Sequence, residues 1–575
     1  MSSSDIAIVG MACVFPGAKD LSGFWTNIVN GVDFVTQIPQ GRFTQTPPFD
    51  PAKYDIRSGI VSTEDPEQLL MLDVIAAALK DADLASNDQI QERTDLIIGR
   101  GEIASLAAPT SSPFASEIAS WLNLKGTSYT IDAGWISSLM AIEQGVTRLR
   151  QNRCDAVVVG GIYIFDKSHS LLLSEGAGAA ILKRRSDAEC SGNRIYGLIK
   201  GVVSTTLSIE GQALNLQQVY RDAGIEPGTI GFLETNGSGI SDSDITEKET
   251  LRSIFGLRDE DQPVRPMSSA KSPIGQTMAA AGMASFIKTA LCLSNKIIPP
   301  SLHCEEPRAE LEDFPFYINT QTRPWIHDFS LPPRRAAINA FGFDGTNTHI
   351  ILEEIQAEDK ISIIREIKPG LIWETELVVF TARTPTELAS KVRQLQQFLG
   401  QDHLDVQLED IAYTLYLNFV ESDPCRIALV CKDLNQLRDY LAISHERLSL
   451  ENVHFDDIDD IYYTPNSSNK PGKIACLFPG FEFPNLLGFY WNCMQDLCLY
   501  FPEARAVFDR VDRRDGNPQD PLPTNYLLLP PMYLSEKERK KIRQRFDSSK
   551  LYICLADPSK RNLTPFGIAV ANWVS

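Results

Sequence analysis

The residue types that most often perform covalent or metal chemistry are scattered along this 575-residue chain. Its eleven cysteines form no CxxC pair, so neither a zinc site nor a disulfide framework is predicted. His303 and Cys304 are adjacent but have no further metal ligands beside them. Cys13 and Cys154 fit small buried apolar residues better than nucleophiles, and His349 fits a structural role better than that of a general base. No metal or resident cofactor is expected from these residues.

The glycine-rich segment 174–178 (SEGAG) is the one stretch that invites a phosphate-loop interpretation. It lacks the Lys-Ser/Thr step that such a loop needs, and it opens an apolar, strand-like run. A nucleotide site is therefore not predicted here.

The elements that would position any site alternate between strands and helices up to about Glu354. Short β-branched runs predict strands, and longer amphipathic runs predict helices. The clearest predicted strands are 5–10, 95–99, 155–160 and 230–234, and the clearest predicted helices are 66–82 and 136–150. The alternation favours a layered α/β domain with largely buried sheets.

The same segment contains an internal repeat. Each half has a buried strand, a turn of small residues and then a helix, around residues 131–150 in the first half and 267–293 in the second. This pattern fits a duplicated α/β layer fold, although periodicity alone does not separate it from other α/β folds.

Five motifs in order across residues 5–354 resemble those of β-ketoacyl synthase domains. They are DIAIVGMACVFPG, the block YTIDAGWISSLMAIEQGVTRLRQNRCDAVVVGG, SEGAGAAILKR, KSPIGQTMAAAGMASFIKTAL and AINAFGFDGTNTHIILEE. The resemblance is to the ketosynthases of modular polyketide and polyunsaturated fatty-acid synthases. It implies a thiolase-like fold of duplicated αβαβα layers, usually dimeric.

In that family a cysteine nucleophile stands in a DxACxSS motif, and Trp135 occupies its place in the sequence DAGWISS. A helix N-terminus there would favour a thiolate, but an indole has no nucleophilic lone pair. Covalent acyl catalysis at this position is therefore excluded. Two interpretations stay open: Trp135 packs the interior of a pseudoenzyme, or it blocks or shapes an acyl tunnel.

The two histidines that the family places in HGTGT and KSxxGH are replaced by Asn236 and Gln276. Amides still donate hydrogen bonds but do not titrate, so a weak polar pocket is expected without proton transfer. Lys271 and Phe343 keep the residue types that the family has at their positions, and we interpret both as structural. The segments 161–174 and 99–123 are shorter than in active relatives, so homodimer formation cannot simply be carried over.

Residues 356–470 resemble the linker domain between a ketosynthase and an acyltransferase. The sequence GKIACLFPGFEFPNLLGFYW then resembles the start of a malonyl-type acyltransferase, with Phe481 in place of a glutamine, and no GxSxG motif follows. The expected domains are residues 1–355, 356–470 and 471–575, the last a partial acyltransferase-like segment. The stretch 524–546 resembles acyltransferase inserts of polyunsaturated fatty-acid and heterocyst-glycolipid synthases.

The composition is that of an ordinary globular protein, with 43% hydrophobic and 22% charged residues. The formal net charge of −20 argues against sequence-independent nucleic-acid binding, and also disfavours an acidic partner in the absence of local basic patches. No signal peptide or membrane-spanning stretch is predicted, so a cytoplasmic location is expected.

The function predicted from these residues is that of a catalytically inactive, chain-length-factor-like subunit. It would pair with an active ketosynthase in an iterative synthase of the polyunsaturated fatty-acid or glycolipid kind. The alternatives are a scaffold that mounts an acyltransferase and a carrier protein, and a residual hydrolytic or decarboxylating activity supported by Asn236 and Gln276. Expected partners are an active ketosynthase and an acyl carrier protein with its phosphopantetheine arm, with a self-dimer as a further alternative.

Overall fold

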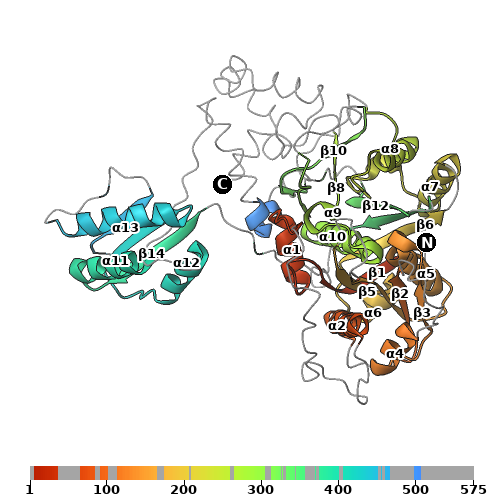
Figure 1. Ribbon diagram of the computed structural model, residues 1–575, viewed down its shortest axis with the longest axis horizontal. Coiled ribbons are helices and arrows are strands. Elements are labelled where there is room, and N and C mark those ends of the chain that lie inside the picture. Colours follow the sequence, from red (N-terminus) through yellow and green to blue (C-terminus); the bar gives the residue numbers. More distant parts are fainter. Residues whose placement is uncertain are drawn as a thin grey trace, which may run out of the picture. The chain divides into compact units, whose positions relative to one another are not determined.

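Figure 1 shows the chain as a computed structural model, which divides into two compact units. The larger unit holds the described residues up to Gly370 together with 498–506, and the smaller unit holds those from 375 to 466. The residues that the structure describes are 5–35, 65–84, 91–101, 113–164, 174–205, 209–258, 264–304, 313–325, 327, 332–342, 345–355, 370, 375–400, 406–450, 455, 460–466 and 498–506.

The larger unit is built on one eleven-stranded sheet with the order β10-β8-β7-β12-β13-β6-β1-β5-β4-β2-β3. Its strands are β1 (Ile6–Val14), β2 (Thr94–Arg100), β3 (Ser128–Ile131), β4 (Ala156–Tyr163), β5 (Gly176–Arg184), β6 (Gly197–Thr205), β7 (Phe232–Glu234), β8 (Arg265–Ser268), β10 (Phe316–Ile318), β12 (Arg335–Phe341) and β13 (Asn347–Glu353).

The strand order repeats itself about the centre of the sheet. Outward from β1, the strands β5, β4, β2 and β3 pair antiparallel, antiparallel, parallel and parallel. Outward from β6, the strands β13, β12, β7 and β8 pair in the same sequence of directions. An antiparallel pairing of β1 with β6 joins the halves. The internal repeat and the thiolase-like fold predicted from the sequence are thereby confirmed.

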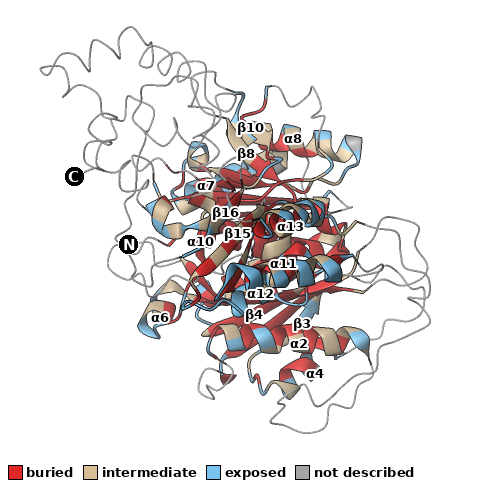
Figure 2. Cartoon of the chain, turned by 90° about the vertical axis from the view of Figure 1, so that its left-hand side faces the viewer, coloured by how far each residue is buried: buried red, intermediate tan, exposed pale blue. Residues whose placement is uncertain are grey.

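Alternate residues of the strands face different helical layers. In β1, Ile6 and Ile8 point into one apolar core while Ala7 and Val9 point into another. Because side chains alternate across a strand, both faces of the sheet must be covered, and the sheet is red with buried residues in Figure 2. Each half of the sheet therefore lies between an inner and an outer layer of helices.

The inner layer consists of α5 (Ser137–Arg150) and α10 (Ala281–Asn295), which pack against each other. They occupy equivalent places in the two halves, because α5 follows β3 and α10 follows β8, the corresponding strands of the repeated order. All fifteen residues of α10 are buried. A helix buried all round has to satisfy every polar side chain internally, and this requirement shapes the site described below.

The outer layers are formed by further amphipathic helices. The first half is covered by α2 (Pro66–Asp81) and α4 (Phe114–Trp121), and the second half by α7 (Ile209–Ala223) and α8 (Ser241–Phe255). The helix α2 begins as its sequence predicts, because Asp65 caps its N-terminus and accepts a hydrogen bond from the Glu67 N–H, with proline at the first helical position.

The smaller unit has a three-stranded antiparallel sheet, β14-β15-β16, and three helices. Its elements are β14 (Glu376–Ala382), α11 (Pro385–Leu399), α12 (Leu408–Leu417), β15 (Cys425–Cys431), α13 (Leu434–Leu448) and β16 (Ile461–Thr464). The hydrophobic pattern of this region predicts strands over 377–381 and 426–430 and helices over 385–399, 410–418 and 434–443. All five are confirmed, with ends that differ by at most five residues.

Other expectations fall outside the described residues. These include the acyltransferase-like strand that begins at Lys473 and the charged helix predicted over 535–546. The three-domain division at residues 355 and 470 stays a prediction. Among the helices that the structure describes, none combines the length and apolar character needed to cross a membrane.

A close packing of backbone on backbone fixes β2 against the start of α5. A Cβ atom added to Gly99 would lie 2.4 Å from both the Ser137 carbonyl carbon and the Ser138 nitrogen. Gly99→Ala should therefore lower the free energy of unfolding by about 1–3 kcal/mol or more, measured by urea unfolding. Gly228→Ala is the matched control, because nothing lies within 4 Å of the added Cβ atom. An equal effect of the two substitutions would contradict this packing.

Candidate active site

The turn that carries Trp135 directly precedes the central helix α5. The short helix η3 (Gly134–Ile136) follows β3 and leads into Ser137, the first residue of α5. The Ser137 Oγ accepts a hydrogen bond from the Ala133 N–H at 2.9 Å and donates one to the Gly134 carbonyl at 2.6 Å, which holds the turn in place. Gly134 has φ +58°, a conformation that favours glycine. Trp135 therefore lies at the helix N-terminus where the family pattern would place a nucleophile.

The indole of Trp135 is partly buried and packs against the main apolar core. Its turn also lies against α10 and against η5 (Met278–Ala280), the short helix that begins two residues after Gln276. The turns of Trp135 and Gln276, 141 positions apart in the sequence, are therefore neighbours in the fold.

Asn236 follows β7 and is buried, with 3% of its surface exposed. Its backbone N–H donates to Glu247 Oε1 at 2.7 Å, and the next N–H, of Gly237, donates to Glu247 Oε2 at 3.1 Å. The Lys271 ammonium donates to both the backbone carbonyl (2.8 Å) and the Oδ1 (2.7 Å) of Asn236. The Lys271 ammonium thus occupies one of the two acceptor sites of the Asn236 Oδ1.

Gln276 lies between α9 (Lys271–Ile274) and η5. Its backbone carbonyl accepts a hydrogen bond from the Ser174 N–H at 2.9 Å. Its side-chain Oε1 is buried and has no hydrogen-bond partner among the described residues. The structure thus joins Lys271 to Asn236 directly and brings Trp135 and Gln276 near through their turns, whereas Phe343 lies outside the described residues.

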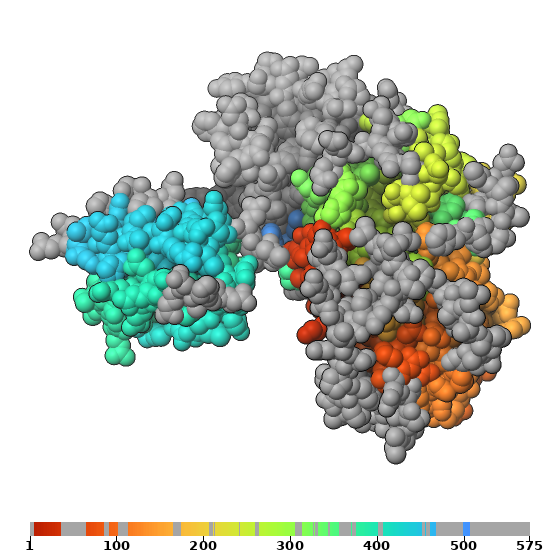
Figure 3. Space-filling view, in the orientation of Figure 1, coloured from red at the N-terminus to blue at the C-terminus, as the bar shows by residue number. Residues whose placement is uncertain are grey.

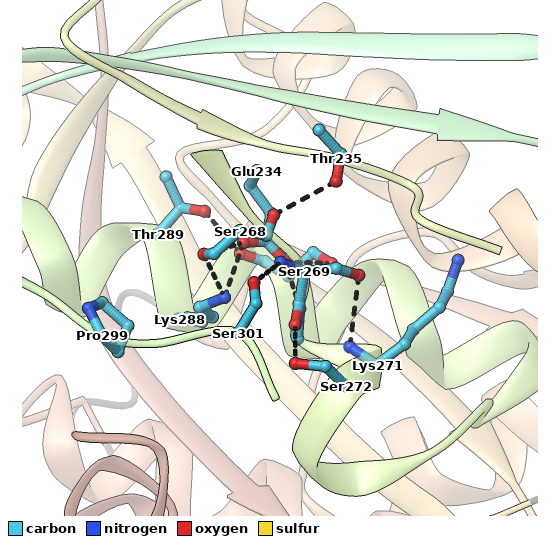
Figure 4. Close-up of polar contacts among 12 residues, drawn as sticks. Glu234, Thr235, Ser268, Ser269, Lys271, Ser272, Lys288, Thr289, Pro299 and Ser301 are labelled. Atoms are coloured by element: carbon cyan, nitrogen blue, oxygen red, sulfur yellow. Dashed lines mark hydrogen bonds and ion pairs between the residues drawn. The ribbon is translucent and has the colours of Figure 1, made fainter. Parts of the chain in front are cut away.

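A buried ion pair behind this site was not predicted from the sequence. Glu234, the last residue of β7, accepts a hydrogen bond from Lys288 Nζ of α10 at 2.8 Å, and both side chains are fully buried. Ser268 accepts from the same ammonium at 2.6 Å, and the Ala270 N–H donates to the carboxylate at 2.7 Å. Figure 4 shows Glu234, Ser268 and Lys288 gathered in this way. A lysine within the apolar run MASFIKTAL was the available signal.

Glu247 links the site to a second buried group. Besides the two backbone donors, its Oε1 accepts from Asn339 Nδ2 at 3.0 Å, and Asn339 Oδ1 lies 3.2 Å from His349 Nδ1. His349 Nε2 in turn lies 3.0 Å from the Tyr220 hydroxyl. Burial lowers the pKa of His349 to about 3. The imidazole is therefore neutral at physiological pH, in agreement with the structural role predicted for it.

Burial also sets the protonation behaviour of the charged groups beside Asn236. It raises the pKa of Glu247, although hydrogen bonds from Asn339, Asn236 and Gly237 and the Lys271 charge act in the opposite direction. It lowers the pKa of Lys271 to about 8, against the attraction of Glu247, Glu234 and Asp244. Lys271 is thus a cation near neutral pH that loses its proton more readily than an exposed lysine.

Within the described residues, the two cysteines of the family motifs offer no replacement nucleophile. Cys13 and Cys154 are buried, and burial raises the pKa of both thiols, that of Cys154 to about 12. Both are therefore inert apolar residues, as the sequence predicted. Within the described part of the chain, no group of three His, Cys, Asp or Glu residues is arranged to hold a metal ion.

The described site residues can donate a few hydrogen bonds to a carbonyl group, but they lack the nucleophile and the titrating imidazole of a condensing enzyme. Their most evident role is structural, because Asn236 follows β7, Trp135 precedes α5 and Gln276 lies in the turn before η5 and α10. The fold and this arrangement together define a class: a thiolase-like domain whose central helix begins at a nucleophile position.

Comparison with known proteins agrees with that class. Residues 3–171 match the family model "Beta-ketoacyl synthase, N-terminal domain", and residues 195–305 match "Beta-ketoacyl synthase, C-terminal domain". Residues 379–447 match "RhiE-like, KS-MAT linker domain". Residues 3–171 and 195–305 thus match the two domains of the β-ketoacyl synthase family, and residues 379–447 match a linker domain that follows a ketosynthase.

Similar proteins place this domain among the ketosynthases of modular polyketide synthases. The polyketide synthases PksN and PksL of Bacillus subtilis are 31% and 27% identical over 71% and 76% of the chain. The chain spans 9% and 11% of their lengths. A ketosynthase from module 6 of the bacillaene synthase of Bacillus subtilis has a TM-score of 0.55 and 25% identity, with 89% of this chain and 92% of that one covered.

A second solved structure gives the same result over a shorter region. An oxazolomycin ketosynthase domain of Streptomyces albus JA3453 has a TM-score of 0.53 and 26% identity, with 61% of this chain and 96% of that chain covered. Almost all of that ketosynthase domain is therefore covered by about three fifths of this chain.

The buried ion pair generates a stability prediction. Lys288→Met would leave the Glu234 carboxylate buried without its cation, so the free energy of unfolding should fall by about 3–5 kcal/mol. The double variant Glu234→Gln/Lys288→Met should be less destabilised than the sum of the two single variants, because no charge is then left buried alone. Urea unfolding of the four proteins measures this coupling. Additive effects would show that the pair does not interact.

The lowered pKa of Lys271 generates a pH prediction. Because the folded protein releases this proton near pH 8 and the unfolded chain near pH 10.5, the unfolding free energy should rise between these values. Lys271→Met should lack this part of the rise, and urea unfolding from pH 7 to 10 measures the difference. The exposed Lys80→Met is the control. Curves of wild type and Lys271→Met that stay parallel above pH 8 would contradict the assignment.

Proposed function

We propose that this chain carries a ketosynthase domain without condensing activity of its own, and that the domain acts by pairing with an active ketosynthase in the manner of a chain-length factor. The observation that carries the proposal is Trp135 at the N-terminus of α5. An indole at this position cannot form the thioester bond on which condensation depends.

The environment of Asn236 supports the same proposal. Decarboxylative condensation needs a donor to the developing enolate and a group that handles a proton. Asn236 Oδ1 is held by the Lys271 ammonium, and the amide does not titrate. Gln276 is likewise an amide, so two imidazole functions are absent at once. A single replacement could leave a partial activity, but loss of the nucleophile and of both imidazoles leaves no condensing step.

A domain that catalyses no reaction acts through binding, and its fold points to an active ketosynthase as the partner. Ketosynthase-like domains share their architecture, so an active ketosynthase offers a surface of matching shape. In such a pair, Trp135 would help to define where the growing acyl chain ends, and the phosphopantetheine arm of a carrier protein would deliver substrate to the active partner. The expected setting is a cytoplasmic synthase.

The assignment to a synthase of polyunsaturated fatty acids or heterocyst glycolipids rests on the acyltransferase-like segment, which resembles the corresponding segment of those synthases. Apart from 498–506, that segment lies outside the described residues.

A scaffold role is the second candidate, favoured by the packing of Trp135 against the core, since a filled pocket leaves no room for an acyl tunnel.

Sedimentation velocity distinguishes the two candidates. The chain mixed with the active ketosynthase of the same synthase should form a defined mixed dimer that neither protein forms alone. A monomer or a self-dimer that ignores the ketosynthase would contradict the pairing and favour the scaffold.

A substitution of Trp135 tests its part in chain length. Removal of the indole enlarges the space at the start of α5, so Trp135→Ala should shift the products of the reconstituted synthase toward longer acyl chains. Trp121→Ala, a change of the same size in α4, is the control and should leave the distribution unchanged. Mass spectrometry of the released products measures the shift. An identical product profile for Trp135→Ala and wild type would count against a tunnel.

A further inference from the structure

The helix α12 of the smaller unit is apolar on two sides. Leu408, Ile411, Ala412 and Leu415 pack into the core of this unit at the spacing of one helix face. On the other side, Tyr413, Tyr416 and Leu417 have 63%, 71% and 64% of their surfaces exposed. Figure 2 shows much of α12 in the colour of exposed residues. A helix with apolar residues all round is normally buried, so the outer side lacks a cover within its own unit.

The apolar surface continues beyond the end of the helix. Phe419 and Val420, in the turn that follows α12, are 37% and 43% exposed. We call Tyr413, Tyr416, Leu417, Phe419 and Val420 the α12 patch. Scattered exposed apolar side chains are ordinary, but five large ones within the eight successive residues 413–420 point to an interaction surface.

The turn within the α12 patch is held in one conformation. The Val420 N–H donates to Thr381 Oγ1 of β14 at 3.2 Å. The Arg426 guanidinium lies 5.3 Å from the centre of the Phe419 ring and donates to the Glu421 carbonyl at 2.6 Å. A surface fixed in this way has little conformational entropy to lose when a partner binds.

The surroundings of the α12 patch are acidic. Glu409 and Asp410 lie in the first turn of α12, and Glu421 follows the patch at the other end. Along the sequence, no lysine or arginine occurs between Arg393 and Arg426, and the Arg426 guanidinium itself lies against Phe419 at the end of the patch next to Glu421. Burial and the charge of Glu409 raise the pKa of Glu376 on the neighbouring strand β14, which places a further carboxyl group in the same negative field. Residues 372–482 contain 18 acidic and 9 basic residues in all.

We propose that the α12 patch is a docking site for a basic amphipathic helix of a partner protein. The apolar face of that helix would cover the tyrosines and Leu417, and its lysines or arginines would lie against the carboxylates at the two ends. An acidic partner is disfavoured by the same charges, so the surface differs in kind from one that would receive an acidic carrier protein.

A second copy of the chain fits this surface less well. If two α12 helices packed antiparallel about a two-fold axis, Glu409 and Asp410 of one copy would meet Glu421 of the other. Like charges that face each other across an interface oppose association. Charge complementarity therefore favours a basic partner over self-association.

Binding of designed peptides to the full chain tests the proposal. The probe is a fluorescent amphipathic helix of about 18 residues with leucines on one face and lysines on the other, and its counterpart has glutamates in place of the lysines. Fluorescence anisotropy should show that the lysine peptide binds, that its affinity falls as salt is raised, and that the glutamate peptide does not bind.

Variants of the α12 patch supply the specific test. The double variant Tyr416→Ser/Leu417→Ser should weaken binding of the lysine peptide by about tenfold or more, equivalent to 1.4 kcal/mol. Tyr462→Ser is the matched control, because Tyr462 is 62% exposed in the same unit but lies on β16. Equal weakening by both variants, or binding of both peptides alike, would overturn the proposal. So would self-association in sedimentation velocity that the double variant abolishes.

Discussion

The buried pair of Glu234 and Lys288 is the contact on which the second half of the larger unit depends. The helix α10 has no exposed residue, so the ammonium of Lys288 must find its partners inside the protein. It finds Glu234 at the end of β7 and Ser268 at the end of β8. Leaving either charge alone would cost several kcal/mol, so the pair fixes how α10 lies across the ends of these two strands.

That placement also determines the neighbouring site. Asn236 follows Glu234 by two residues, and Lys271 follows Ser268 by three, so the two loops that carry them leave the sheet side by side. Lys271 therefore contacts Asn236 directly. Both residues belong to an internal hydrogen-bond network, with Glu247 at its centre.

The two units differ in how their helices are covered. In the larger unit, the inner helix α10 is buried on every side between the sheet and other helices. In the smaller unit, α12 exposes large apolar side chains on its outer side, with acidic residues at both ends of the α12 patch. The first arrangement supplies a rigid body of known shape, and the second supplies a surface whose chemistry selects partners by charge.

The sequence by itself determined the fold class and the chemistry that is missing. Repeated strand and helix patterns predicted the duplicated layers, because hydrophobic periodicity is a local property of the chain. The five ordered motifs predicted the positions of Trp135, Asn236 and Gln276, and the loss of a nucleophile follows from the indole itself.

The tertiary structure alone decided how these residues are held. The partners of Lys288, Lys271 and His349 lie between 10 and 129 positions away in the sequence, and no local pattern encodes such contacts. The exposed side of α12 was likewise hidden, because its two apolar faces look alike in the sequence and only packing shows which one is covered. Chemistry depends on residue type, which a sequence states directly, whereas burial and pairing depend on which distant segments meet.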